Sequence, residues 1–140
     1  MIDEIYQKDL LRLAASATGA GRLESPDASV TVDNPLCGDR VTFDLSLEDG
    51  KISEVAHNVK GCVLCQASAS VLGAHAVGET AAGLRAVQTA VHGMLEGSGG
   101  LDGHWDELGS FRPVAAHKSR HNCVLLPFEA LIKAGAQSQA

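Results

Sequence analysis

Hydrophobic residues recur with a helical period at the start of the chain and then alternate with polar residues in the segments that follow. The first pattern predicts an amphipathic helix that ends near the glycines at 19 and 21, with apolar positions at Ile2, Ile5, Tyr6, Leu10 and Leu13. The alternation predicts three strands, at about 30–32, 41–47 and 52–59. Between the second and third strands, Asp49-Gly50 is typical of a tight hairpin turn. We therefore expect a small antiparallel sheet.

After Gly61 the hydrophobic period changes from two to about 3.6. This pattern predicts helices at 62–77, 79–95 and 123–134, with a short segment around Trp105, Leu108 and Phe111 before the last of them. Residues 135–140 are expected to form a disordered tail. The order of elements predicts an α+β fold in which a small three-stranded antiparallel sheet carries helices on one face. At 140 residues, the chain is expected to form a single domain, 1–140.

Composition narrows the class of protein. The hydrophobic content is 45% but the aromatic content only 4%, so the core is expected to consist mainly of Ala, Val, Leu and Ile. The formal charge of −6 argues against a nucleic-acid partner, which requires a concentrated basic surface. The sequence has no long apolar run that predicts a membrane span, and its acidic start does not resemble a signal peptide. A cytoplasmic protein is expected, in which cysteines are free thiols or metal ligands.

Three of the four cysteines fall where one predicted element meets the next. Cys37 lies in a turn-forming stretch between two strands, and Cys62 follows Gly61 where a strand gives way to a helix. Cys123 precedes a helix whose first turn is placed by Pro127, because proline lacks the amide hydrogen that an interior turn requires. Helix N-termini favour thiolates, which are the form that binds metal and accepts sulfur.

These positions predict a metal centre. Asp39 stands two residues after Cys37, across a glycine, so both side chains can turn toward one ion. Three thiolates and one carboxylate suit tetrahedral zinc, and their net charge favours a neighbouring cation. The expected ligands are Cys37, Asp39, Cys62 and Cys123, with Arg120 and then His121 as the supporting cations.

The other candidate side chains are given ordinary roles. Cys65 completes a Cys-x-x-Cys spacing with Cys62, and it is interpreted either as a buried structural residue or as an accessory thiol or redox partner. A thiol–disulfide oxidoreductase is not favoured, because no thioredoxin-like strand–helix context is expected before this motif. A zinc deaminase is not favoured either, since Gly61 replaces the required proline and Asp39 the required glutamate. The remaining histidines are interpreted as solvated or structural, and these are His57, His75, His92, His104 and His117.

The chain resembles the U-type iron–sulfur assembly proteins, the family of IscU, SufU and the N-terminal part of NifU, from Ile2 to Lys133. The Asn-Pro-x-Cys-Gly-Asp motif of that family is similar to residues 34–39. Its Gly-Cys segment, which leads into Ala-Ser-Ala-Ser, is similar to residues 61–70. Its third cysteine motif is similar to residues 120–123.

The SufU-like branch fits best. SufU-like proteins have an extended segment between the second and third cysteines, which 80–118 matches here, and an arginine three residues before the last cysteine, which Arg120 matches. IscU-like proteins instead place a histidine directly before that cysteine, where this chain has Asn122.

This resemblance implies that Cys37, Asp39, Cys62 and Cys123 bind zinc. It implies that the protein receives persulfide sulfur from a pyridoxal-phosphate cysteine desulfurase (SufS-like), with Cys37 as the catalytic thiol freed when the partner docks. Such a protein would be a zinc-dependent sulfurtransferase, and it would pass sulfur to downstream assembly proteins. The alternative is a non-enzymatic scaffold on which iron and sulfur form a [2Fe–2S] cluster for delivery to apo-proteins. The resemblance also suggests a monomer or weak dimer.

Overall fold

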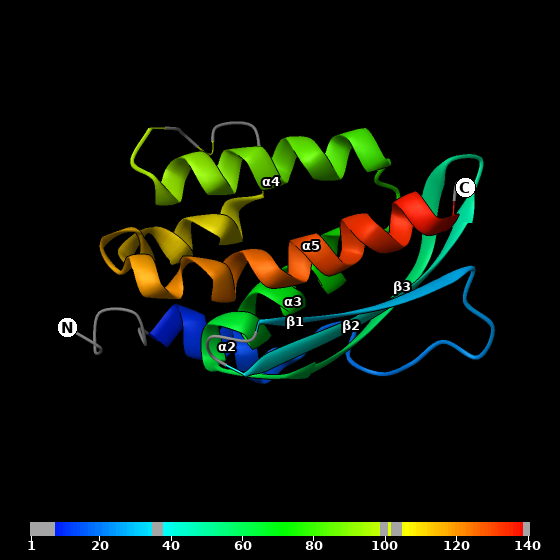
Figure 1. Cartoon of the computed structure of the whole chain (residues 1–140), viewed down its shortest axis with the longest axis horizontal. Coiled ribbons are helices and arrows are strands. Elements are labelled where there is room, and N and C mark those ends of the chain that lie inside the picture. Colours follow the sequence, from blue (N-terminus) through cyan, green and yellow to red (C-terminus); the bar gives the residue numbers. More distant parts are fainter. Residues whose placement is uncertain (1–7, 35–37, 99–100, 102–104, 139–140) are drawn as a thin grey trace.

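The structure, a computed structural model, describes residues 8–34, 38–98, 101 and 105–138. In Figure 1 the elements are coloured along the sequence, from blue near the N-terminus to red near the C-terminus. They are α2 (Lys8–Ser16), β1 (Ala28–Asn34), β2 (Asp39–Glu48), β3 (Lys51–Lys60), α3 (Val63–His75), α4 (Ala81–Leu95), the 3-10 segments η1 (Asp106–Ala116) and η2 (Lys118–Arg120), and α5 (His121–Ser138).

The predicted meander is confirmed. The strands form one antiparallel sheet in the order β1-β2-β3. Asp49 and Gly50 both have positive φ, at 55° and 79°, which is the backbone of the tight turn that Asp-Gly favours. Along β2 the side chains of Val41, Phe43 and Leu45 are wholly buried, as the alternation predicts.

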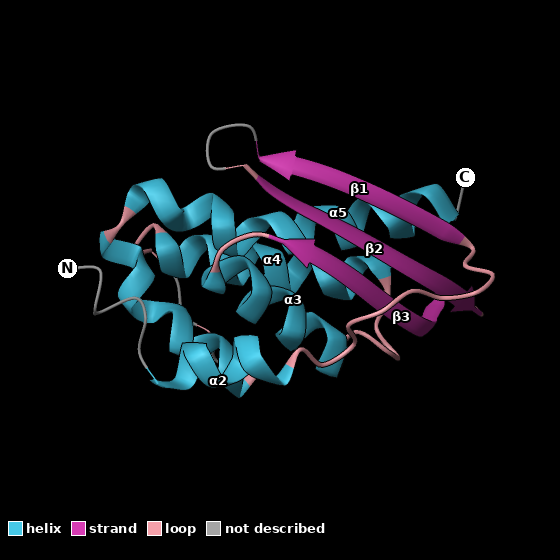
Figure 2. Cartoon of the chain, turned by 90° about the horizontal axis from the view of Figure 1, so that it is seen from below, coloured by secondary structure: helices cyan, strands magenta, loops and turns pink. Residues whose placement is uncertain are grey.

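The helices cover one face of this sheet, so the predicted α+β class is confirmed. In Figure 2 the strands form one layer, with α3, α4 and α5 behind them. α5 lies against β1 and β2, while α3 lies against β3. α2 packs on α3, and α4 packs on the side of α5 away from the sheet. Among the described residues, no helix is long and apolar enough to cross a membrane.

Two predictions about the last helix are wrong. α5 begins at His121, so Cys123 lies in its first turn and Pro127 in its second. Proline removes the bond that the Cys123 carbonyl would accept, and the Ser68 hydroxyl donates to the adjoining Val124 carbonyl at 2.6 Å. The helix also continues to Ser138, whereas the sequence predicts a disordered tail from residue 135. Buried Ala134 shows why: packing, which the sequence pattern does not reveal, holds this turn in place.

A buried carboxylate fastens the loop before β1 to the sheet. The Asp44 side chain is 0% exposed and accepts hydrogen bonds from Arg22 Nε at 2.7 Å, the Ser29 hydroxyl at 2.6 Å and the Leu23 amide at 3.1 Å. Burial tends to raise the pKa of Asp44, but the bonds from Arg22, Ser29 and Leu23 outweigh it, and the pKa is lowered.

Acid is therefore expected to weaken the fold through Asp44. The pKa of Asp44 is lower in the folded chain than in the unfolded chain, where it is about 3.9. The stability that Asp44 contributes is therefore complete above the unfolded pKa and is lost as pH falls through the folded pKa. Asp44→Asn should lower the free energy of unfolding by about 1–2 kcal/mol at neutral pH, a value kept small because Arg22 faces solvent. Urea unfolding at neutral and acid pH measures this, and the gap between the two proteins should narrow in acid. A gap that stays constant with pH would contradict this role.

Candidate metal centre

Three separate elements bring Asp39, Cys62 and Cys123 to one place. Asp39 is the first residue of β2, Cys62 is the N-cap of α3 and Cys123 is in the first turn of α5. One possible ligand atom from each lies within 4.8 Å of the other two. Asp39 and Cys123 are buried, at 4% and 0% exposure, while Cys62 is half-buried. Two sulfurs and a carboxylate at this spacing have the chemistry of a metal site.

Asp39 and Cys62 are held together by two contacts. The Cys62 amide donates to Asp39 Oδ1 at 3.2 Å, and the Cys62 thiol donates to Oδ2 at 3.6 Å. Gly61 permits this approach, because a Cβ at that position would lie 2.8 Å from both Cγ and Oδ1 of Asp39. The glycine before the cysteine is therefore part of the site's construction.

The environment of Cys62 favours the thiolate. Hydrogen bonding from the Cys123 thiol is the largest cause that lowers the pKa of Cys62 to about 7, against the opposing effects of burial and the Asp39 carboxylate. The amides of Cys65 and Leu64 also lower this pKa, although neither forms a capping hydrogen bond with the sulfur. The contribution of these two amides is the effect of a helix N-terminus on a cysteine, which the sequence predicts, while the larger contribution comes from Cys123.

Gly61→Ala is expected to weaken metal binding without unfolding the chain. The new methyl group would displace the Asp39 carboxylate, so affinity for Zn²⁺ or Co²⁺ should fall by about tenfold, the size of effect seen when groups that orient ligands are lost. Competition titration with a chelating dye measures the affinity. Gly135→Ala, which meets no atom within 4 Å, is the control and should bind as the wild type does. Wild-type affinity in Gly61→Ala would place Asp39 outside the site.

The fourth predicted ligand, Cys37, lies outside the described residues. The described residues on either side of it are paired: Asn34 with Asp39 across β1 and β2, and Arg40 Nε with Asp33 Oδ1 at 2.6 Å. Gly38 has φ of +77° and its amide donates to the Asn34 carbonyl at 2.8 Å. This pairing holds Asp39 at the edge of the site, two residues after Cys37 in the sequence.

The three residues expected to support the metal centre, Cys65, His121 and Arg120, lie in different surroundings. Cys65 is 0% exposed and belongs to the hydrophobic core, while its amide faces Cys62. His121 Nε2 contacts the Ala115 carbonyl at 3.1 Å, and Nδ1 is 3.8 Å from Glu96 Oε1. The role of His121 as a second cation at the site stays a prediction. Arg120 is half-buried at the end of η2, directly before α5.

A family model for the NifU-like N-terminal domain matches residues 5–121 of the chain. The chain belongs to this family. The structure of a NifU-like protein (N-terminal) from Brucella abortus is 40% identical, covers 99% of this chain and 96% of its own, and has a TM-score of 0.92. A putative iron–sulfur cluster assembly scaffold protein for the SUF system from Fervidobacterium islandicum AW-1 is 24% identical over 94% of this chain and 96% of its own. With a TM-score of 0.87, it shares the fold.

Sequence relatives of this NifU-like domain carry another of the expected names. The iron–sulfur cluster assembly scaffold protein IscU of Thermotoga maritima is 25% identical over 130 residues, which is 93% of this chain and 92% of that protein. NifU, SufU and IscU names therefore all occur among the similar proteins, and the SufU-like branch stays a prediction.

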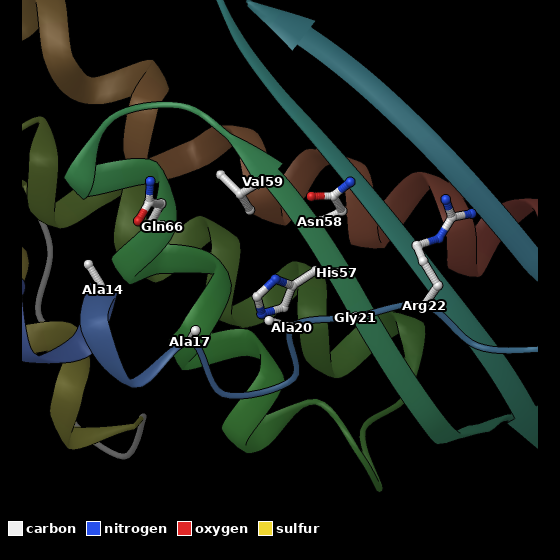
Figure 3. A pocket seen from close by; sticks show the side chains of 9 residues that line it. All are labelled: Ala14, Ala17, Ala20, Gly21, Arg22, His57, Asn58, Val59 and Gln66. Carbon is white, nitrogen blue, oxygen red and sulfur yellow. The ribbon is translucent and has the colours of Figure 1, made fainter.

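A separate pocket of about 340 Å³ lies between the end of α2, β3 and the start of α3 in this NifU-like domain (Figure 3). Its wall includes His57, which is 4% exposed rather than solvated, and whose Nε2 contacts the Thr18 carbonyl at 2.7 Å. Burial lowers the pKa of His57 and outweighs the opposing effect of Thr18, so the ring is neutral at physiological pH. Gln66 connects the pocket to the metal centre, since it also donates to the Gly61 carbonyl at 3.0 Å.

Two residues near the site make contacts that the sequence does not predict. Gly61 carries a signal only as a turn residue, and its contact with Asp39 depends on how β2 and α3 meet. His75, interpreted from the sequence as solvated or structural, also makes contacts with a distant segment. Its Nε2 lies 2.8 Å from Glu107 Oε2, and its ring stacks on Trp105. That contact joins the end of α3 to η1, which leads through η2 to Cys123.

Proposed function

We propose that this chain is an iron–sulfur cluster assembly protein that binds metal through Asp39, Cys62 and Cys123, completed by Cys37. The observation that carries the proposal is the meeting of a carboxylate and two cysteine sulfurs, from three elements, within 4.8 Å. Membership of the NifU-like N-terminal family supports it, as does the scaffold name of the Thermotoga maritima relative.

The residues fit both metals that the proposal allows. Cysteine sulfurs are soft ligands that suit zinc and iron–sulfur clusters, and one carboxylate is compatible with either. Resident zinc would hold the thiols deprotonated until sulfur arrives. The half-buried Cys62 offers a route to the site from solvent, while Cys123 and Asp39 form its buried side.

The finer proposal is a zinc-dependent persulfide acceptor. Its partner is a SufS-like cysteine desulfurase with pyridoxal phosphate, and Cys37 accepts the sulfur as its thiolate. Arg120 supplies positive charge near the site, and sulfur passes to downstream assembly proteins in the cytoplasm. In this chain Asp39 restrains Cys62 through the two contacts described above, so that Cys37 is the thiol that accepts the sulfur first.

The second candidate is a scaffold, on which iron and sulfide are cargo and a [2Fe–2S] cluster forms before transfer to apo-proteins. The name of the Thermotoga maritima relative, a scaffold protein, favours this role. The same donor set serves it, so the metal held by the purified protein decides between the two.

Metal analysis of freshly purified protein, with its visible spectrum, separates the two roles. Colourless protein with one equivalent of zinc supports the persulfide acceptor, and brown protein with iron and acid-labile sulfide supports the scaffold. Incubation with a cysteine desulfurase and cysteine, followed by peptide mapping, should find the persulfide on Cys37. Protein with no metal and no persulfide would contradict both roles.

A further inference from the structure

The proposed metal centre leaves one thiol without a function. Cys65 lies three residues after Cys62, in the first turn of α3, and is wholly buried while Cys62 is half-buried. Among the described residues, the potential metal cluster contains Cys62 but not Cys65. The pair therefore combines a reachable thiol with a shielded one, a single helical turn apart.

The pair lies at the junction of a strand and a helix that the sequence predicts. β3 ends at Lys60 and α3 begins at Val63, so the Cys-x-x-Cys spacing stands where a strand runs directly into a helix. Cys62 is the N-cap, with φ of −72° and ψ of 171°, and the amides of Leu64 and Cys65 lie by its sulfur. Thiol–disulfide couples use a Cys-x-x-Cys pair at a helix N-terminus.

We propose that Cys65 is the resolving thiol for a persulfide carried on Cys62, and that it releases hydrogen sulfide for cluster assembly. This inference rests on the proposed function for the arrival of persulfide sulfur on Cys37: the Cys62 thiolate attacks the outer sulfur of that persulfide, and Cys37 leaves as its thiolate. It adds the step that reduces that sulfur, because a persulfide carries sulfur at the zero-valent level whereas a cluster contains sulfide.

The step balances without an external reductant. The Cys65 sulfur attacks Sγ of the Cys62 persulfide, a Cys62–Cys65 disulfide forms, and the bond between Sγ and the outer sulfur breaks. The outer sulfur leaves with the electron pair and takes the Cys65 proton, so the product is H₂S. The two cysteines are oxidised by two electrons, and the transferred sulfur is reduced by two. A dithiol reductant then restores both thiols before the next cycle.

Cys123 is the competing resolving thiol, because it also hydrogen-bonds the Cys62 sulfur. Two features favour Cys65. Residues one turn apart at a helix start keep their Cα atoms within the roughly 4.4–6.8 Å that a disulfide spans. Reaction at Cys65 also leaves Asp39 and Cys123 in place to hold metal after reduction, so sulfide release and metal binding share only Cys62.

Sulfide release from metal-free, reduced full-length protein tests the proposal, with glutathione persulfide as the sulfur donor. Wild type should release sulfide without added reductant, beyond the background of Cys62→Ala, and end with a Cys62–Cys65 disulfide in its peptide map. Cys65→Ala should release sulfide at least about tenfold more slowly and keep a persulfide on Cys62 until dithiothreitol is added. Val63→Ala, in the same turn of α3, is the control and should behave as wild type.

Two results would overturn the proposal: wild-type sulfide release by Cys65→Ala, or a wild-type disulfide that maps to Cys62–Cys123. Circular dichroism confirms that the variants fold, and Cys65→Ser, closer in size to cysteine, should show the same loss of sulfide release. Zinc and iron binding of the same preparations reports separately on the proposed function. Sulfide release without metal binding would refute the proposed metal centre and leave this inference standing. Metal binding without Cys65-dependent sulfide release would refute this inference and leave the metal centre standing.

Discussion

Cys123→Ala is expected to weaken metal binding strongly while the chain stays folded. Cys123 supplies one of the two sulfurs described at the site, and its loss leaves Cys62 and Asp39 as the described ligands. Affinity for Co²⁺ should fall by more than about 100-fold, since loss of a group that merely orients a ligand costs about 10–100-fold. The thiolate-to-cobalt charge-transfer band measures this directly, and it should weaken in intensity because fewer sulfurs bind the ion.

Cys65→Ala provides a matched control for this experiment. Both cysteines are 0% exposed, and the substitution removes the same atom from the core, at a cost of about 1–2 kcal/mol in either case. Cys65 does not belong to the cluster, so its variant should retain the wild-type affinity and spectrum. Equal losses in the two variants would show that the effect comes from the core and would remove Cys123 from the site.

Gly73→Ala is expected to destabilise the fold strongly. The loop after α2 crosses α3 at this residue, and a Cβ would lie 1.9 Å from the Thr18 carbonyl oxygen and 2.7 Å from its carbon. Both neighbours are backbone atoms of a loop that also bonds β3, through Gly19 and Gly21 to His57. A rotamer change therefore cannot relieve the overlap between the new Cβ and Thr18, and the free energy of unfolding should fall by at least about 2 kcal/mol.

Gly135→Ala is the control for Gly73→Ala. It replaces a helical glycine whose Cβ would meet nothing within 4 Å, so the higher helix propensity of alanine should raise stability by up to about 1 kcal/mol. Thermal unfolding should therefore shift in opposite directions for the two variants. A Gly73→Ala protein as stable as wild type would mean that the loop does not cross α3 at this distance.

The parts of the fold that the sequence predicts are those with a local cause. Alternation along 41–47 marks β2, and Asp49-Gly50 fits only a turn with positive φ. The metal-centre residues are predictable for a related reason, since Cys62 and Cys123 stand where the hydrophobic period changes, and helix ends present side chains to a common point. That Cys62 and Cys123 lie close to Asp39 depends on the tertiary structure; the family resemblance implies this proximity, and the structure shows it.

The features that the sequence does not predict depend on contacts between distant segments. Pro127 suggests a helix start near Cys123, but packing on the sheet and the Ser68 hydroxyl carry the helix through the proline from His121. Asp44 occupies the polar position of an alternating strand, yet Arg22 and Ser29 bury it completely. Gly73 carries no pattern at all, because its importance lies in its contact with Thr18, a residue far from it in the sequence.

Metal retention tests the central claim most directly, when wild type and Cys123→Ala are each loaded anaerobically with Zn²⁺, or with ferrous iron and sulfide, and compared after desalting. Wild type should retain zinc if it is the persulfide acceptor, or iron and acid-labile sulfide together if it is the scaffold. Cys123→Ala should retain neither. Equal retention of zinc, iron and sulfide by the two proteins, or none by the wild type, would contradict a metal centre at Asp39, Cys62 and Cys123.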